Sequence, residues 1–311
     1  METTQTLIKI ARLYYFENLP QREIAANLNI SRIKVHRLLL KAKEEGLIEI
    51  KLNVPAKDYS ELEIKIEKQF GLKECNVVPS SEFKTQIYEN MGKALSTLLD
   101  RHLKKNTYLG FGWGSTLRGV AENVNFDKPF NVNVIPLIGG LGSDGQKINA
   151  NSIVRLMAHR IGGKGYILNC PAFVKNKEAK DMFMNEKVVK DVFSLVKKVS
   201  TAVVSIGNLN PKMTVRKMDI MKEEELNYLQ GLNAIGDVNA NFINKEGEPV
   251  INKVQDKIIN TDLESLDGIK NVIGIGFNER KVEVIRAALK KRIINMLITD
   301  SKTAENILQY D

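Results

Sequence analysis

The chain has 311 residues, of which 43% are hydrophobic and 27% are charged, and its formal net charge is +9. This composition is typical of a globular protein with two domains, and it argues against disordered and fibrous classes. No apolar run approaches the ~20 residues of a membrane-spanning helix, and the first residues lack the pattern of a signal peptide. Cys75 and Cys170 are far apart and have no CxxC spacing. We therefore expect a cytoplasmic protein with two reduced thiols and no membrane segment.

Basic residues are concentrated near the N-terminus. The stretch "SRIKVHRLLLKAK", residues 31–43, holds five lysines and arginines and no acidic residue, whereas lysines and acids intermingle elsewhere. A positive net charge favours a polyanionic partner, and this stretch is where we expect the contact.

The first 53 or so residues are predicted to form three helices and a strand. The second helix begins at Gln21, and small Ala25 lies where two helices must cross closely. Asn29 suits a turn that needs a left-handed backbone, and Ser31 is a natural N-cap for the third helix. Residues 47–54 alternate with period two and predict a strand that would form a wing. This spacing is typical of a winged helix-turn-helix domain.

The exposed face of the third helix is predicted to bind double-stranded operator DNA. The N-terminal end of such a helix meets base edges and phosphates in the major groove. Arg32 and Arg37 suit base or phosphate contacts, and Lys34 and Lys41 suit phosphate contacts. The alternative is a three-helix interaction module whose basic face is only solvated. The residues that we expect at the DNA interface are Gln21, Ser31, Arg32, Lys34, His36, Arg37 and Lys41.

After a predicted linker at 55–60 and a helix to about Phe70, strands and helices alternate from about residue 74 onward. We predict strands at 76–78, 108–111, 132–137, 164–168, 201–206, 234–243, 271–275 and 295–299. We predict helices at 84–103, 151–161, 185–198 and 279–290, among others. Short apolar strands in this alternation predict an α/β domain with a mostly parallel, doubly wound sheet. The predicted domains are residues 1–54, which bind DNA, and residues 55–311, which bind an effector and oligomerise.

The stretch "GFGWGST", residues 110–116, joins a predicted strand to a helix that opens on two hydroxyls. The N-terminus of such a helix offers free backbone N–H groups and suits a phosphate. The stretch lacks the lysine of a nucleoside-triphosphate loop and the GxGxxG spacing of a dinucleotide loop. We expect a generic phosphate-binding loop, and the alternative is a tight turn that binds nothing.

Four other predicted strand ends carry glycine-bearing turns, and ligands of such sheets bind beyond the carboxyl ends of the strands. These turns are "PLIGGLGS" (136–143), "SIGNLNP" (205–211), "AIGDVNANF" (234–242) and "GIGFNERK" (274–281). Asp237 can accept hydrogen bonds from sugar hydroxyls, and Lys281 can complement a phosphate or carbonyl oxygen. The residues that we expect around an effector are Gly112, Gly114, Ser115, Thr116, Gly139, Gly140, Gly207, Asp237 and Lys281.

Catalysis finds little support in the sequence. None of the three histidines shows metal-ligand spacing with another histidine, a cysteine or an acid, and Ser115 has no cue for a base partner. We predict no catalytic residue, no metal and no cofactor.

The chain resembles the SorC/DeoR sugar-binding transcriptional regulators over nearly its full length. The resemblance rests on "LYYFENLPQREIAANLNISRIKVHRLLLKAKEEGLIEI" near the N-terminus and on "GWGSTL", "PLIGGLG", "GDVNANFINKEGEPV" and "KVEVIRAALKKRIINMLITDSKTAENIL" further along. It implies an effector domain with the fold of sugar-phosphate isomerases and glucosamine-phosphate deaminases, in which ligand binding is kept and catalysis is lost. It also implies a homo-oligomer, a tetramer or alternatively a dimer, that releases or rearranges on DNA when a phosphorylated sugar binds.

By position, the resemblance implies that residues 114–116 and the turn at 139–140 bind phosphate, while Asp237 and Lys281 bind the sugar. Some relatives of the deoxyribonucleoside type have a lysine before the Gly-Gly pair that can form an imine, but this chain has Ile138 there. His36 replaces a common serine, and residues 274–277 depart from the usual Ala-Gly-Gly turn.

These observations predict a DNA-binding transcription regulator that is controlled by a phosphorylated sugar. Two alternatives stay open from the sequence. One is a catalytically active sugar-phosphate isomerase or deaminase fused to a DNA-binding head. The other is a constitutive DNA-binding protein whose α/β domain only oligomerises.

Overall fold

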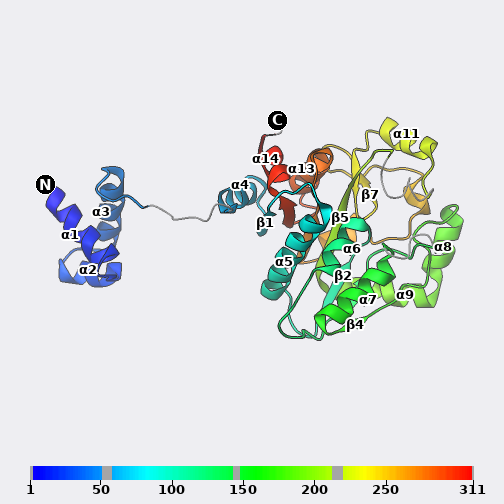
Figure 1. The fold of residues 1–311 in the computed structure, drawn as a ribbon, viewed down its shortest axis with the longest axis horizontal. Coiled ribbons are helices and arrows are strands. Elements are labelled where there is room, and N and C mark those ends of the chain that lie inside the picture. The colour runs from blue at the N-terminus through cyan, green and yellow to red at the C-terminus, as the bar shows by residue number, and fades with distance from the viewer. Residues whose placement is uncertain (1–2, 51–57, 143–147, 212–219, 310–311) are drawn as a thin grey trace. The chain divides into compact units, whose positions relative to one another are not determined.

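The computed structural model describes residues 3–50, 58–142, 148–211 and 220–309. The chain divides into two compact units, Met1–Lys57 and Asp58–Asp311, which are described separately below (Figure 1). We call them the head and the α/β unit. Among the described residues, no helix combines the length and the apolar character that crossing a membrane requires.

The head consists of three helices, α1 (Thr4–Tyr15), α2 (Gln21–Asn27) and α3 (Arg32–Glu44). Apolar residues at helical spacing from all three helices form one small core. Its buried members are Leu7, Ile10, Ile24, Ala25, Val35, Leu38, Leu39 and Ala42. The helices therefore depend on one another, because none of them buries an apolar face alone.

The turn between α2 and α3 has the predicted conformation. Asn29 adopts a left-handed backbone with φ 52°, and the Ser31 hydroxyl accepts a hydrogen bond of 3.1 Å from the backbone N–H of Lys34. The predicted strand at 47–54 is not seen: residues 47–50 form no strand, and residues 51–54 lie outside the described part of the chain. The described residues of the head contain no strand, so residues 47–50 have no partner among them for a hydrogen-bonded ladder.

The α/β unit is built on a parallel sheet, as predicted. Its strands are β1 (Glu74–Val78), β2 (Tyr108–Phe111), β3 (Asn133–Pro136), β4 (Lys164–Gly165), β5 (Val199–Asn208), β8 (Asn271–Ile275) and β9 (Met296–Asp300). They lie side by side in the order β1-β9-β8-β5-β2-β3-β4, and each of these pairings is parallel. The register places Ala202 of β5 between Gly110 of β2 and Val272 of β8.

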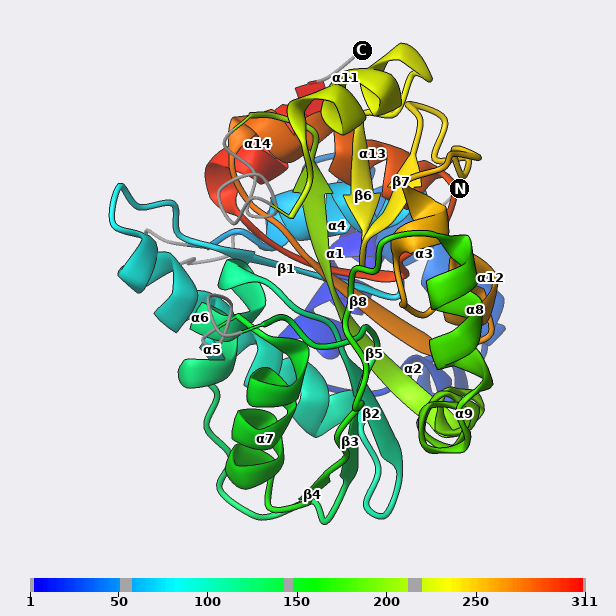
Figure 2. The same cartoon turned by 90° about the vertical axis from the view of Figure 1, so that its right-hand side faces the viewer.

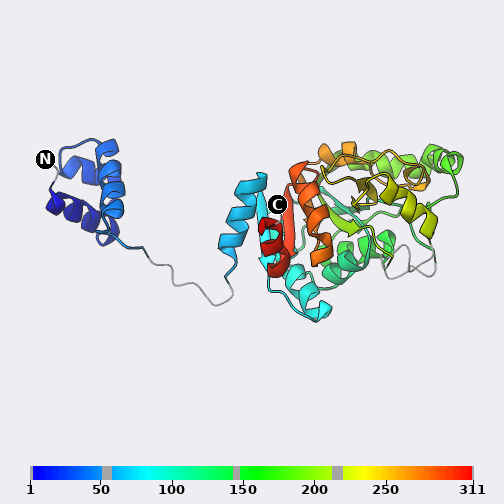
Figure 3. The ribbon, with the colours of Figure 1, turned by 90° about the horizontal axis from the view of Figure 1, so that it is seen from above.

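Helices cover both faces of the sheet (Figures 2 and 3). One face packs against α5 (Lys84–His102), α6 (Ser115–Glu122) and α7 (Ala150–Ile161). The other packs against α4 (Ser60–Phe70), α9 (Lys187–Ser194), α13 (Val282–Lys290) and α14 (Ser301–Gln309). Consecutive residues of β5 alternate between the faces: Val203 belongs to the first core and Val204 to the second. The central strands β2, β5 and β8 are mostly apolar because both of their faces are buried.

Shorter helices complete the unit: α8 (Lys177–Asn185), η2 (Leu195–Lys198), α11 (Glu223–Gly231), η3 (Gln255–Lys257), α12 (Leu263–Asp267) and η4 (Glu279–Lys281). Two predicted helices therefore each contain a 3₁₀ turn. Residues 195–198 end the helix predicted at 185–198, and residues 279–281 open the one predicted at 279–290.

The single strand predicted at 234–243 is instead a hairpin of β6 (Gly236–Val238) and β7 (Asn241–Ile243). Its two turn residues, Asn239 and Ala240, have φ of 51° and 60°. Two consecutive left-handed residues are typical of a tight hairpin turn that matches the twist of its strands. β6 also pairs antiparallel with the end of β5, and this pairing sets Asp237 opposite Gly207.

The order of the strands changes direction between β2 and β5. The chain runs outward from β2 to β3 and β4, then returns to β5 on the other side of β2 and continues to β8 and β9. At such a reversal the loops that leave two neighbouring strands diverge, which opens a crevice beyond their carboxyl ends.

Candidate functional site

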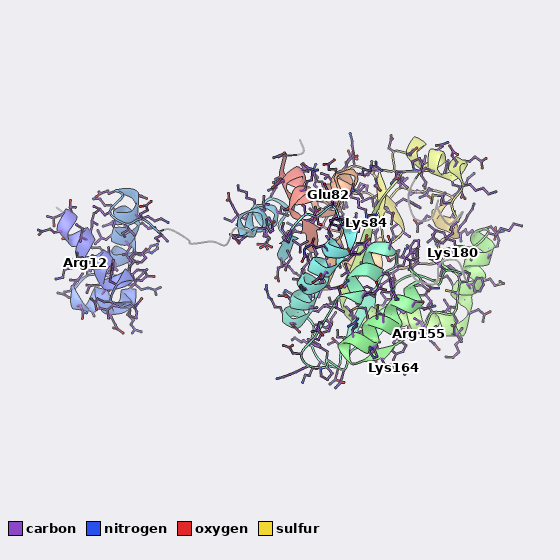
Figure 4. The ribbon with its side chains drawn as sticks, viewed as in Figure 1. Arg12, Glu82, Lys84, Arg155, Lys164 and Lys180 are labelled. Carbon is purple, nitrogen blue, oxygen red and sulfur yellow. The ribbon has the colours of Figure 1, made fainter. Side chains whose placement is uncertain are left out.

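A cavity of about 360 Å³ lies at this crevice. The described residues that line it are Lys84, Tyr88, Trp113, Gly114, Ser115, Thr116, Ser205, Ile206, Gly207, Asn208, Asn210, Asp237, Phe277, Asn278, Arg280 and Lys281. They come from the start of α5, the β2–α6 loop, the end of β5, the β6 strand and the segment after β8. In Figure 4 the labelled Lys84 lies near the middle of the unit, whereas the labelled Lys164, which begins β4, lies near its lower edge.

The N-terminus of α6 forms one wall of the cavity. Gly114 caps the helix with φ 110°, a conformation that glycine adopts without strain, and it offers no side chain to the helix end. Ser115 and Thr116 follow as the first helical residues. First-turn N–H groups have no acceptor within their own helix, and they carry the positive end of the helix dipole. This wall can therefore receive an anionic oxygen.

Tyr88 of α5 lines the cavity beside that wall. Its phenol interacts with the hydroxyls of Ser115 and Thr116, and burial raises the pKa of Tyr88 against these two interactions. Its ring packs edge-on against Phe277, with the ring centroids 6.0 Å apart. Gly119 leaves room for the ring, because a Cβ at this position would lie 2.3 Å from a ring carbon.

The pairing of β6 with β5 places Asp237 in the lining of the cavity. A Cβ at Gly207 would lie 2.3 Å from Asp237 Oδ1, so the absent side chain of Gly207 makes the space for this carboxylate. Asp237 Oδ2 accepts a hydrogen bond of 2.9 Å from the backbone N–H of Ala240. Burial raises the pKa of Asp237, and the Ala240 hydrogen bond and the charge of Lys281 act in the opposite direction.

Lys281 supplies a half-buried ammonium on the same side. The pKa of Lys281 is lowered to about 8, chiefly by burial and also by the charge of Lys84, while the charge of Asp237 opposes both effects. Within the described residues, Lys281, Lys84 and Arg280 have no hydrogen bond or ion pair from their side chains. The cavity thus brings three cations together with one carboxylate.

The loop that carries Arg280 and Lys281 is fixed by Asn278. This residue has φ 97°, its backbone N–H donates to Thr303 Oγ1 at 2.8 Å, and its side chain accepts from the backbone N–H of Arg280 at 3.1 Å. The backbone N–H of Lys281 in turn donates to the carbonyl of Asn278 at 2.9 Å. The two cations therefore sit on a turn that is set before any ligand arrives.

The structure brings six of the nine predicted effector residues to the cavity: Gly114, Ser115, Thr116, Gly207, Asp237 and Lys281. Gly112, Gly139 and Gly140 are not among the described residues that line it. Their N–H groups already donate to the carbonyls of Val203, Ile259 and Cys170, at 2.9, 2.9 and 2.8 Å. Gly139 also serves close backbone packing, since a Cβ at this position would lie 2.4 Å from the carbonyl oxygen of Pro171.

Ten residues that line the cavity were not predicted from the sequence: Lys84, Tyr88, Trp113, Ser205, Ile206, Asn208, Asn210, Phe277, Asn278 and Arg280. A signal for the first two was present: a helix that follows β1 starts at the carboxyl edge of the sheet, and residues 84 and 88 share one face of that helix. Asn278 and Arg280 stood inside a turn that had already been singled out, "GIGFNERK", but only its lysine was selected.

In the head, Ser31, Arg32, His36 and Arg37 are exposed at the N-terminal half of α3. Gln21, Lys34 and Lys41 are half-buried. The Lys41 ammonium lies 3.7 Å from the carboxylate of Glu45, one turn further along the helix. Val35, Leu38, Leu39 and Ala42 turn into the core, so the basic residues are displayed on the opposite face.

The chain has a basic three-helix head and an α/β unit whose cavity, at the reversal of the strand order, is lined by cations. These features are typical of the class of ligand-responsive transcriptional regulators. The profile of the family described as "Putative sugar-binding domain" matches residues 54–309. The chain belongs to this family of sugar-binding transcriptional regulators, whose relatives include the SorC type.

Two curated relatives span almost the whole chain. The sorbitol operon regulator of Klebsiella pneumoniae is 30% identical over 310 residues, covering 97% of this chain and 97% of that protein. The deoxyribonucleoside regulator of Bacillus subtilis is 27% identical over 309 residues, covering 99% and 98%. The crystal structure of the full-length sorbitol operon regulator SorC from Klebsiella pneumoniae superposes with a TM-score of 0.76 at 28% identity, covering 98% of each chain.

These relatives confirm the predicted family, its fold class and its role as a regulator of transcription. They do not support the alternative of an active isomerase or deaminase, because the matched proteins are named as regulators and not as enzymes. Among the described residues, no three histidines, cysteines or acids gather as they would around a metal ion.

Replacing Gly207 with alanine is expected to displace Asp237 and to weaken ligand binding about tenfold. The new Cβ would collide with Asp237 Oδ1, and moving the carboxylate breaks its bond to Ala240, which costs about 1 kcal/mol of stability. Thermal unfolding and calorimetric titration measure the two effects. Gly231→Ala is the matched control, because nothing lies within 4 Å of a Cβ there. Equal behaviour of the two variants would contradict the role given to Gly207.

Proposed function

We propose that the chain is a transcription regulator whose α3 helix binds double-stranded operator DNA and whose cavity binds a small phosphorylated sugar. Sugar binding changes the affinity for DNA, and by linkage DNA changes the affinity for the sugar by the same factor. A coupling of about 1 to 3 kcal/mol corresponds to a change of roughly 5- to 150-fold.

The observation that carries this proposal is the charge of the cavity. Lys84, Arg280 and Lys281 face a single carboxylate, Asp237, beside the N-terminus of α6. If all four groups are ionised, two positive charges remain uncompensated. A phosphate monoester carries about −1.5 to −2 at pH 7, so it balances this excess and accepts hydrogen bonds from the helix N-terminus.

The remaining lining suits a polyhydroxylated carbon chain. Ser205, Asn208, Asn210 and Asn278 offer donors and acceptors around Asp237, while Trp113 and Phe277 supply apolar walls. A few placed polar groups among aromatic and apolar walls are typical of a small-molecule site. The distribution favours a ligand with one strongly anionic end and several hydroxyls.

The DNA-binding part of the proposal rests on the head. The exposed cations of α3, Arg32 and Arg37, sit at its N-terminal half, where a recognition helix meets bases and phosphates. Ser31, Lys34, His36, Lys41 and Gln21 are the other proposed contacts. A single head reads only a few base pairs, so we infer a homo-oligomer on a palindromic or repeated operator. A tetramer is proposed, with a dimer as the alternative, and light scattering distinguishes them. We place the protein in the cytoplasm, together with its DNA and its metabolite.

Fluorescence anisotropy tests the proposal, with the protein titrated on its own upstream DNA in the presence of a panel of sugar phosphates. The expected result is tight duplex binding that one sugar phosphate shifts, while the matching unphosphorylated sugar does not. Binding that no member of the panel changes would favour a constitutive DNA-binding protein with an oligomerising α/β unit. No binding to duplex DNA at moderate salt would overturn the proposal.

A further inference from the structure

Ile33 is the second residue of α3 and its side chain is 80% exposed. It lies in the first turn of the helix, directly between Arg32 and Lys34, and one turn before His36 and Arg37. It is therefore a large apolar side chain near the start of the basic, acid-free stretch at residues 31–43.

Packing within the head does not explain this residue. The core-facing side of α3 is formed by Val35, Leu38, Leu39 and Ala42, and Ile33 points away from it. Single exposed apolar residues are common on protein surfaces and need no explanation by themselves. The position of Ile33 is what distinguishes it, because the N-terminal turn of a recognition helix faces the base edges.

The floor of the major groove offers donors, acceptors and one apolar group, which is the C5 methyl of thymine. The neighbouring cations bring α3 against phosphates and bases, so the side chain between them must enter the same groove. An isoleucine packed against the polar edge of a base would remove water from donors and acceptors without replacing their hydrogen bonds. A thymine methyl instead gives the isoleucine an apolar partner.

We propose that Ile33 packs against the C5 methyl of a thymine and specifies a T·A pair at that position of each half-site. This inference rests on the proposed function, since it assumes that α3 lies in the major groove. It adds a readout that the cations cannot supply, because lysine and arginine contacts select phosphates and guanine edges.

The test combines two changes, one on each side of the contact. Uracil lacks the C5 methyl of thymine and keeps its hydrogen-bonding groups, so each thymine of the footprinted operator is replaced in turn by deoxyuridine. Wild-type protein and Ile33→Ala are titrated on every duplex. Removing a buried methyl corresponds to roughly a fourfold loss of affinity. We expect one thymine in each half-site whose replacement weakens wild-type binding by about fourfold or more and leaves Ile33→Ala unaffected.

Leu40→Ala is the matched control. Leu40 is 48% exposed on the same side of the helix, seven residues further along, so its truncation also removes an exposed apolar side chain. It is expected to keep the full uracil effect of the wild type. Both residues are exposed, so neither variant should alter thermal unfolding.

If every uracil substitution affects wild type and Ile33→Ala equally, the inference is overturned while the proposed function stands. A uracil effect that disappears in Leu40→Ala instead would likewise overturn it. If wild-type protein fails to bind any duplex, the proposed function fails and the inference falls with it. The outcomes therefore separate the two claims.

Discussion

Lys281→Met is expected to weaken binding of the phosphorylated sugar by roughly 10- to 150-fold, the range for losing a hydrogen bond to a charged group. Lys281 is one of three cations in the cavity, and it has no hydrogen bond or ion pair with any described residue, so its charge is available to the ligand. Methionine keeps most of the length and the apolar stem. Affinity for operator DNA without sugar should stay unchanged, because the head is untouched.

Isothermal titration calorimetry measures the sugar affinity of this variant, and anisotropy measures its DNA affinity. Lys302→Met is the matched control: Lys302 is an exposed lysine of α14 that pairs with Glu279 at 2.8 Å and does not line the cavity. A loss of DNA affinity in Lys281→Met, or an equal loss of sugar affinity in Lys302→Met, would contradict the division of labour between the two units.

The same residue makes the sugar affinity depend on pH. The pKa of Lys281 is about 8 in the free protein, so its amine is mostly charged at pH 7 and mostly neutral at pH 9. The second pKa of a phosphate monoester is about 6, so the ligand stays dianionic over this range. Affinity should therefore fall as pH rises past 8, by up to about tenfold per unit. Lys281→Met should flatten this profile, and an unchanged profile would assign the titration to another group.

Much of the fold could be predicted from local sequence patterns. β2 and β8 have the predicted boundaries because short apolar runs are framed by glycine, asparagine and lysine on either side. The β6–β7 hairpin was missed because Val238, Ala240 and Phe242 alternate with polar residues straight through its turn, as they would in one continuous strand. A turn of two residues leaves little trace in a hydrophobic pattern. Residues 47–50, the described part of the period-two stretch, form no strand for a different reason, since alternation describes one strand and says nothing of its partner.

The candidate site could be predicted where a residue's role depends on its own loop. Lys281 follows β8, and all carboxyl ends of a parallel sheet meet at one edge. Asp237 lies instead within β6, and the antiparallel pairing of β6 with the end of β5 brings it to that edge. Gly139 and Gly140 could not be judged in this way. Their N–H groups are taken by the carbonyls of Ile259 and Cys170, which are distant in sequence, so their availability is a property of the tertiary structure.

Gly207 has a role in the site through Asp237, although not the role that was predicted for it. Gly207 and Asp237 are thirty residues apart, and a side chain at the first would occupy the space of the second. Gly207 was predicted to contact the ligand directly. In the structure it lies against the carboxylate of Asp237, and this carboxylate is proposed to bind the ligand. The role of Gly207 is thus indirect, and only the antiparallel pairing of β5 with β6 reveals it.

The reciprocal change in the head is the double variant Arg32→Ala and Arg37→Ala, which is expected to weaken operator binding by about 100-fold or more. Each contact of an arginine with a base or phosphate contributes roughly 1 to 3 kcal/mol, and the two residues are exposed at the N-terminal half of α3. Sugar affinity without DNA should remain at the wild-type value, because neither residue belongs to the α/β unit.

Salt dependence separates the roles of the two arginines. For each single variant, anisotropy is measured on operator and on unrelated duplex DNA at several salt concentrations. An arginine that contacts phosphate lowers the salt slope by about 1 when it is removed and weakens both duplexes alike, whereas one that contacts a base weakens the operator selectively. Lys43→Ala, an exposed residue in the last turn of the same helix, is the control for charge alone. If Lys43→Ala weakens the operator as much as either arginine variant, the N-terminal half of α3 is not the reading surface, and the docking proposed for the head is wrong.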